Sequence, residues 1–280
     1  MADLEALVWG YGLLEGPRYD AATDSLYFSD VPNGGVYRLD VQGGGIEVAI
    51  PKRKGVGGIA LHERGGLVVG GRNVCHVLAG ETRVLFQPAS NGLNDLFADS
   101  AGNVIFGSLR DDPFAFGTER KAGEGWRITA EGEATELYGG VLLSNGIGLS
   151  PDGLVIYHAD TASNGVWAHD YQVDGPVSGR RLQIHADDLQ PDALAIDEDG
   201  VVWVADVSGS RAVRAFDPQG TEVARIDVPA RMVTSICFGG ADRRDVYIVT
   251  ADNTVQPERG GTVFRTRAEV AGTAIPKATI

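Results

Sequence analysis

Four oxygen-bearing side chains stand at the same place in four copies of a repeated sequence pattern. Each begins an otherwise apolar run that reads as a buried strand, where an aliphatic residue or glycine would be the structural choice. The four residues are Glu15, Asn94, Asn145 and Asp192. Burying two carboxylates and two carboxamides around one point is costly without a partner, because desolvated polar groups lose their water and like charges repel. The pattern therefore predicts one divalent cation among these residues.

Oxygen ligands without thiolate favour a hard cation, with water completing its coordination. We expect Ca²⁺, while Zn²⁺, Mg²⁺, Mn²⁺ and Fe²⁺ stay open because oxygen-rich sites also bind them when they are available. The structural alternative is that each residue caps a strand or closes a turn, which Asn and Asp often do. Four such residues at equivalent positions favour the cation.

The elements that position these residues are hairpins in a sixfold repeat. Each copy has a polar residue, an apolar strand, a tight turn, a second apolar strand and then a small or acidic residue. The copies begin at Glu15, Gly57, Asn94, Asn145, Asp192 and Thr234, at intervals of about 37 to about 51 residues. Alternating outer strands such as GVYRLDV and GTVFRTR lie between them.

This period predicts an all-β, six-bladed β-propeller with four-stranded antiparallel blades, formed as a single domain over residues 1–280. A β-sandwich is the rival architecture, but it does not explain the period. The first strand of every propeller blade lines the central channel. Residues at the same repeat position should therefore point toward one axis from different blades.

Charge and cysteine content exclude some classes of partner. The formal net charge of -14 disfavours nucleic acid, which requires clustered Lys and Arg. Cys75 and Cys237 lie in apolar runs without metal-ligand spacing and are expected as buried thiols. No basic, apolar leader opens the sequence, and no apolar stretch approaches the roughly 20 residues of a membrane span. We expect a cytoplasmic monomer or weak homodimer that binds neither nucleic acid nor membrane.

The sequence resembles the family of gluconolactonases, regucalcin (senescence marker protein) and luciferin-regenerating enzyme over almost its whole length. The resemblance lies in LLEGPRYD around Glu15, NGLND around Asn94, LSNGIGLSPDG around Asn145 and QPDALAIDEDGVVWVAD around Asp192. It implies a six-bladed propeller that binds one divalent ion through Glu15, Asn145 and Asp192, while Asn94 contacts substrate or a water at the ion. It also implies hydrolysis of a small lactone, often a sugar lactone.

For that reaction we expect Asp192 to be the general base that orients and deprotonates a water, with Glu15 as a plain ligand. The mixed-charge segment at about residues 108–125 interrupts the third repeat. The resemblance makes it a lid in which Asp112 contacts substrate, and a solvated surface loop is the alternative.

The chain departs from the family pattern beside Asn94. Sugar lactonases of the family usually have an Arg where this chain has Gly92, and an Asn-Asp-Gly-Lys run is replaced by Asn94-Asp95-Leu96-Phe97. Both changes remove polar donors and add apolar bulk. We therefore expect a lactone with fewer hydroxyl groups than gluconolactone.

Two other functions stay open on the sequence alone. One is hydrolysis of an aryl ester or organophosphate at the same ion, and the other is a non-catalytic, ligand-binding propeller with a structural ion. A serine hydrolase is disfavoured because no GxSxG motif occurs, and the five histidines lack zinc-binding spacing.

Overall fold

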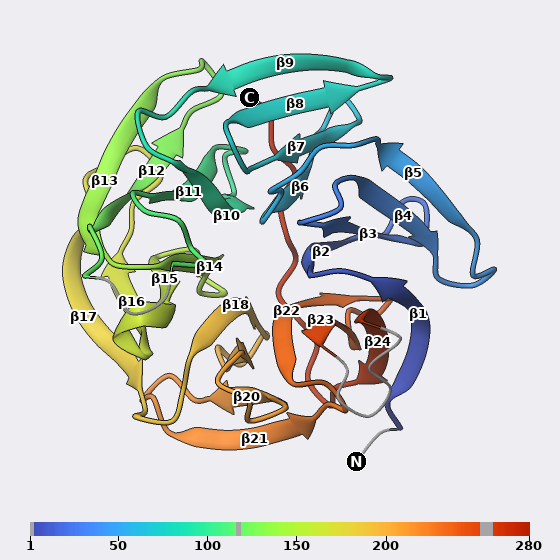
Figure 1. Cartoon of the computed structure of the whole chain (residues 1–280). Coiled ribbons are helices and arrows are strands. Elements are labelled where there is room, and N and C mark those ends of the chain that lie inside the picture. The colour runs from blue at the N-terminus through green and yellow to red at the C-terminus, as the bar shows by residue number, and fades with distance from the viewer. Residues whose placement is uncertain (1–2, 116–118, 253–259) are drawn as a thin grey trace.

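Six four-stranded antiparallel sheets form a ring around a central axis in the computed structural model (Figure 1). The structure describes residues 3–115, 119–252 and 260–280. It confirms the predicted six-bladed β-propeller. A short 3₁₀ helix, Thr161–Ser163, follows one of the strands. No helix in the described ranges is long and apolar enough to cross a bilayer.

Blades 1 to 5 are each built from four consecutive strands, ordered from the channel outward. Blade 1 is β2 (Leu14–Asp20), β3 (Ser25–Asp30), β4 (Val36–Asp40) and β5 (Ile46–Ile50). Blade 2 is β6 (Ile59–Leu61), β7 (Leu67–Val69), β8 (Val74–Leu78) and β9 (Glu81–Phe86). Blade 3 is β10 (Gly92–Ala98), β11 (Val104–Leu109), β12 (Gly123–Ile128) and β13 (Ala134–Val141).

The second half of the ring repeats this order. Blade 4 is β14 (Ser144–Leu149), β15 (Val155–Asp160), β16 (Gly165–Asp170) and β17 (Ser178–His185). Blade 5 is β18 (Pro191–Ile196), β19 (Val202–Asp206), β20 (Ala212–Phe216) and β21 (Glu222–Asp227). Blade 6 is β22 (Met232–Gly239), β23 (Asp245–Asp252), β24 (Gly261–Arg267) and, on its outer edge, β1 (Glu5–Tyr11).

The N-terminal strand closes the ring. Strand β1 pairs antiparallel with β24, and an ion pair of 2.7 Å joins Arg265 to Glu5 across the two strands. The last blade is thereby completed by the start of the chain, so that all six sheets have four strands.

Burial follows the distance from the axis. The inner strand β14 is buried along its whole length, whereas β5 and β21 on the rim are mostly exposed. Apolar side chains pack between neighbouring blades, as where Leu14 and Phe28 of blade 1 meet Tyr247 of blade 6. Burying one such large apolar side chain contributes about 1.5–3 kcal/mol. This packing between blades fixes the inner strands.

The C-terminal segment closes one end of the channel. It crosses the ring near its centre (Figure 1) and bonds to the far ends of inner strands. The Thr273 amide donates to the Ile196 carbonyl at 2.9 Å, and the Ala278 amide donates to the Leu61 carbonyl at 2.8 Å. The opposite end of the inner strands, where the repeats begin, carries the polar residues that the sequence singled out.

Candidate cation site

The predicted ligands stand at the start of three inner strands from three blades. Glu15, Asn145 and Asp192 are each the second residue of their strand, and each is buried, with 7–9% of its surface exposed. The pairing register of each of these strands shifts at the proposed ligand or directly after it, as in a β-bulge. A bulge bends the strand and re-aims the neighbouring side chain, which explains how a residue of a buried strand can point along the channel.

Hydrogen bonds link the two asparagines and the blade of Asp192. The Asn94 side-chain amide donates to the Ser144 carbonyl at 2.9 Å and to Asn145 Oδ1. Asn145 Nδ2 donates to Thr161 Oγ1 at 2.7 Å, and Thr161 Oγ1 donates to the Pro191 carbonyl at 2.6 Å. The Asn145 amide is therefore held with its nitrogen on Thr161, which leaves its oxygen as the group that can bind a cation.

Burial and neighbouring negative charge raise the pKa values of both acidic residues. Burial, and then the negative charges of Asp192 and Asp95, raise the pKa of the Glu15 carboxyl well above its usual value. Burial and the charge of Asp95 likewise raise the pKa of Asp192 well above its usual value. These shifts mean that the carboxylates lack a compensating positive charge, and a bound cation would supply it.

The donor set fits a hard divalent ion. In the described part of the chain, no three His, Cys, Asp or Glu side chains are grouped so that they could hold a metal by themselves. A cation here would therefore use Glu15, Asp192 and the amide oxygen of Asn145, with water for its other positions. Such a set of oxygens suits Ca²⁺ or Mg²⁺ better than soft ions.

The remaining repeat positions serve the site indirectly. A Cβ added at Gly57 would collide with Asn94 Oδ1, so glycine at this position makes room for the asparagine of the next blade. Thr234 is fully buried, and its hydroxyl donates to the Leu14 carbonyl at 2.6 Å, directly before Glu15.

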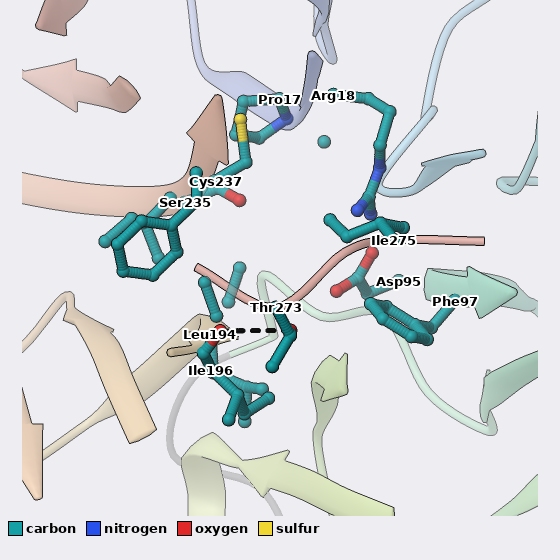
Figure 2. A pocket seen from close by; sticks show the side chains of 15 residues that line it. Pro17, Arg18, Asp95, Phe97, Leu194, Ile196, Ser235, Cys237, Thr273 and Ile275 are labelled. Carbon is teal, nitrogen blue, oxygen red and sulfur yellow. Dashed lines mark hydrogen bonds between the residues drawn. The ribbon is translucent and has the colours of Figure 1, made fainter. Parts of the chain in front are cut away.

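A small cavity of about 20 Å³ lies farther along the channel and is lined by residues of four inner strands and the C-terminal segment (Figure 2). It has room for about one water molecule. Arg18 and Asp95 both line this cavity, and the Arg18 side chain points toward Asp95 (Figure 2). Arg18 Nε donates to the Ile59 carbonyl at 2.9 Å. The cavity is too small for a lactone.

Asp95 is a buried carboxylate that the site prediction did not include. It accepts the Leu96 amide at 2.8 Å and the Ile147 amide at 3.2 Å. Burial raises its pKa to about 6, against the opposing charge of Arg18 and these two hydrogen bonds. Its position directly after Asn94 is the one sequence signal that could have identified it.

A buried hydrogen-bonded chain lies behind Asn145. His158 is fully buried, with Nε2 2.8 Å from Ser144 Oγ and Nδ1 3.0 Å from Tyr138 OH. Burial, and then the charges of His169 and Arg180, lower the pKa of His158 to about 3. The imidazole is neutral and enclosed, so it supports the strand of Asn145 and does not face the channel.

Asp112 belongs to the segment that was expected to cover the channel. It is exposed in the segment between β11 and β12, and its Oδ1 accepts the Phe114 amide at 2.9 Å. No hydrogen bond between described residues joins it to Asn94 or Asn145. The predicted lid at about 108–125 includes residues 116–118, which lie outside the described residues. Its closure over substrate and the contact from Asp112 stay predictions.

The two departures from the family pattern have different structural consequences. Leu96 is fully buried in the core with Val68 and Phe106, so it adds no apolar surface where substrate would bind. Gly92 has a φ of 156°, and a Cβ there would lie 3.1 Å from the Gly71 carbonyl oxygen. Gly92 thus lacks a side chain two residues before Asn94, whereas Leu96 is part of the core.

Known proteins are similar to this chain in sequence. The family described as the SMP-30/gluconolactonase/LRE-like region matches residues 13–252. A 6-deoxy-6-sulfogluconolactonase of Pseudomonas putida is 30% identical over 94% of this chain and 93% of its own length. A pentonolactonase of Haloferax volcanii is 30% identical over 85% and 81%, and regucalcin of Bos taurus is 28% identical over 88% of each chain.

Solved structures show the same fold. A luciferin-regenerating enzyme superposes with a TM-score of 0.90 at 22% identity, covering 100% of both chains. A calcium-binding protein, regucalcin, from Agrobacterium tumefaciens superposes with a TM-score of 0.87 at 20% identity, covering 100% of this chain and 98% of its own. With its ring of six blades and its polar inner-strand residues, this chain belongs to the SMP-30/gluconolactonase/LRE-like family.

Proposed function

We propose that this protein is a divalent-cation-dependent lactonase that opens a small lactone ring at the open end of its channel. The observation that carries the proposal is the meeting of Glu15 and Asp192, two buried carboxylates from different blades whose pKa values are raised by burial and by neighbouring negative charge. Two relatives that are 30% identical are named as lactonases, which supports a cyclic ester as substrate. The calcium-binding neighbour supports Ca²⁺ as the ion.

Each residue has a separate role in the proposal. Glu15, Asn145 and Asp192 hold the ion, which when bound supplies a Lewis acid that polarises the ester carbonyl. Asp192 also orients and deprotonates the attacking water, because it is a carboxylate beside the ion, and the charge of the ion keeps it ionised. The water oxygen bonds to the carbonyl carbon, the ring C–O bond breaks, and the departing oxygen takes a proton to give a hydroxy acid.

Substrate preference is set around Asn94. Its side chain contacts Asn145 directly, so a lactone bound there would meet both residues. Gly92 offers no side chain to hold a sugar hydroxyl, which supports a less hydroxylated lactone than gluconolactone. Asp112 is proposed to contact substrate from the β11–β12 segment.

The test couples elemental analysis of the purified protein to a pH-drop assay with aliphatic, aromatic and sugar lactones, before and after chelation. We expect hydrolysis that chelation abolishes and Ca²⁺ or another divalent ion restores. Asp192→Ala should lose turnover and bind the ion more weakly. The control Asp187→Ala removes an exposed carboxylate from the connector that leads into β18. It should leave turnover and ion binding unchanged.

Three outcomes would contradict parts of the proposal. Turnover that survives chelation would exclude the cation, and turnover by metal-loaded Asp192→Ala would remove Asp192 as the base. Aryl esters or organophosphates hydrolysed faster than every lactone would replace the substrate class.

A further inference from the structure

Three buried aspartates close the second strand of the same three blades that carry the proposed ligands. Asp30 ends β3, Asp160 ends β15 and Asp206 ends β19, and each is no more than 2% exposed. In the strand register each pairs with the residue directly before a ligand: Leu14 with Asp30, Ser144 with Asp160 and Pro191 with Asp206. Each carboxylate accepts hydrogen bonds from the connector that leads into the inner strand of its blade.

In blade 1 the carboxylate holds the connector before Glu15. Asp30 Oδ2 accepts the Gly12 amide at 3.0 Å. The residue after Asp30 also bonds to this connector, because the Val31 amide donates to the Leu13 carbonyl at 2.9 Å. The connector is thereby held by a donor and an acceptor two to three residues before Glu15.

Blade 4 repeats this arrangement before Asn145. Asp160 Oδ1 accepts the Leu143 amide at 2.9 Å, and Oδ2 accepts the Leu142 amide at 3.0 Å. The Thr161 amide donates to the Leu143 carbonyl at 3.1 Å.

Blade 5 repeats it before Asp192. Asp206 Oδ1 accepts the Gln190 amide at 3.2 Å, and the Val207 amide donates to the Gln190 carbonyl at 3.0 Å. Leu13, Leu143 and Gln190 thus all stand two residues before a proposed ligand, and each gives its carbonyl to the residue that follows the aspartate.

The other three blades carry no carboxylate at this position. By the same register it is Ser108 in blade 3 and Thr250 in blade 6, and in blade 2 it is Gly71, two residues past the paired Val69. The aspartate therefore occurs with the ligand and is not a general requirement of the hairpin.

A neighbouring blade holds the residue that faces each aspartate. The carbonyls of Leu14, Ser144 and Pro191 accept hydrogen bonds from Thr234, Asn94 and Thr161 respectively. Each ligand is therefore fixed from two sides, by its own blade through the aspartate and by the preceding blade through the carbonyl before it.

We propose that Asp30, Asp160 and Asp206, which we name the clasp aspartates, are positioning residues that aim Glu15, Asn145 and Asp192 at the cation. This inference rests on the proposed function. Hydrogen bonds from backbone amides to a carboxylate are stronger than those to a neutral acceptor. Coordination requires ligands within about 0.5 Å of their working positions, so a connector released at its anchor loosens the ligand that follows it. Support residues of this kind change metal affinity by about 10- to 100-fold.

The test compares Asp→Asn variants of the clasp aspartates with Asp99→Asn and Asp197→Asn. The two control aspartates are equally buried and each accepts two backbone amides, but in the hairpin turns at the other end of the inner strands. Asp197 lies five residues after Asp192, or about 17 Å along the strand. Asparagine keeps the shape and one acceptor oxygen, and Asp→Ala variants of the same residues give a graded series.

Calcium titration calorimetry on metal-stripped protein gives the dissociation constant, and chemical unfolding in chelator gives the stability of each variant. We expect the clasp variants to raise the dissociation constant about 10- to 100-fold, with alanine worse than asparagine. The controls should lower the unfolding midpoint but keep the dissociation constant within about twofold of wild type. Excess Ca²⁺ should restore turnover to the clasp variants.

The outcomes separate the two proposals. Equal dissociation constants for clasp and control variants, in a wild-type protein that binds the ion, would overturn the positioning role alone. Wild-type protein that binds no divalent ion would overturn the proposed function and this inference with it.

Discussion

Replacing His158 tests the buried chain behind the site through the pH dependence of stability. His158→Gln removes an imidazole that lies between Ser144 Oγ and Tyr138 OH and is fully enclosed. Burial is the main cause that lowers the pKa of His158, and the nearby charges of His169 and Arg180 act in the same direction.

The magnitude follows from the shift. The pKa of His158 falls from 6.5 to about 3 on folding. Between these two pH values the unfolded chain therefore binds a proton that the folded protein does not bind. Stability from this group is fully present above pH 6.5 and is lost as the pH falls toward 3. Between pH 7.5 and 4.5 the loss is about 2.7 kcal/mol, because the unfolded chain takes up its proton over about two pH units at 1.36 kcal/mol each.

The assay is urea unfolding in chelator at pH 4.5, 5.5, 6.5 and 7.5. At pH 7.5 the variant should be less stable by about 1–3 kcal/mol, since a buried hydroxyl loses its partner. At pH 4.5 the difference should have moved by about 2.7 kcal/mol in favour of the variant, which should then be about as stable as wild type or more stable, because glutamine has no proton to accept. His185→Gln, at an exposed histidine, checks that loss of an imidazole alone has no such effect. A difference between wild type and His158→Gln that is constant with pH would refute the reasoning.

Three further predictions follow from the geometry. Chelation should lower the melting temperature measured by calorimetry, and Ca²⁺ at 100 times its dissociation constant should raise the free energy of unfolding by about 2.7 kcal/mol; a melting temperature insensitive to both would contradict cation binding. Gly107→Ala should cost about 1–3 kcal/mol in urea unfolding, because its Cβ would overlap Ser144 Oγ and lie 2.9 Å from His158 Nε2; a neutral result would show that this part of the blade interface relaxes easily. Asp112→Ala should raise KM for the best lactone about tenfold with little change in kcat, and an unchanged KM would remove Asp112 from the substrate site.

The sequence predicted the six-bladed repeat, and the structure places the polar residues of the first repeat position on inner strands, as expected. The reason is that a propeller reuses one hairpin, so a polar residue at the start of a buried strand is conspicuous in several copies at once. The ring closure by Glu5–Tyr11 was not predicted, since β1 lies outside the repeat and pairs with residues some 250 positions away in the chain.

The supporting residues could not be predicted for a related reason. Thr161 follows an acidic hairpin end that is visible in the sequence, but its hydroxyl meets Asn145 and Pro191 only once two blades are packed. The prediction for Leu96 was wrong. This residue was expected to make the substrate site more apolar, but its side chain is buried in the core between two blades. Whether a strand residue faces the channel or a neighbouring blade depends on the bulge after Asn94, which alternation alone does not reveal.

Ring closure and cation binding should be coupled in this protein. The carbonyl before Glu15 is held by Thr234 of blade 6, and blade 6 is complete only when β1 pairs with β24. Loosening that outer pairing should weaken the blade whose inner strand carries Thr234, and with it the contact that Thr234 makes next to Glu15. A cation that binds only the aligned ligands stabilises the closed ring in return, by linkage. The blades therefore need not differ in fold to form the proposed site, because three of six equivalent hairpins carry both a proposed ligand and an aspartate that holds its connector.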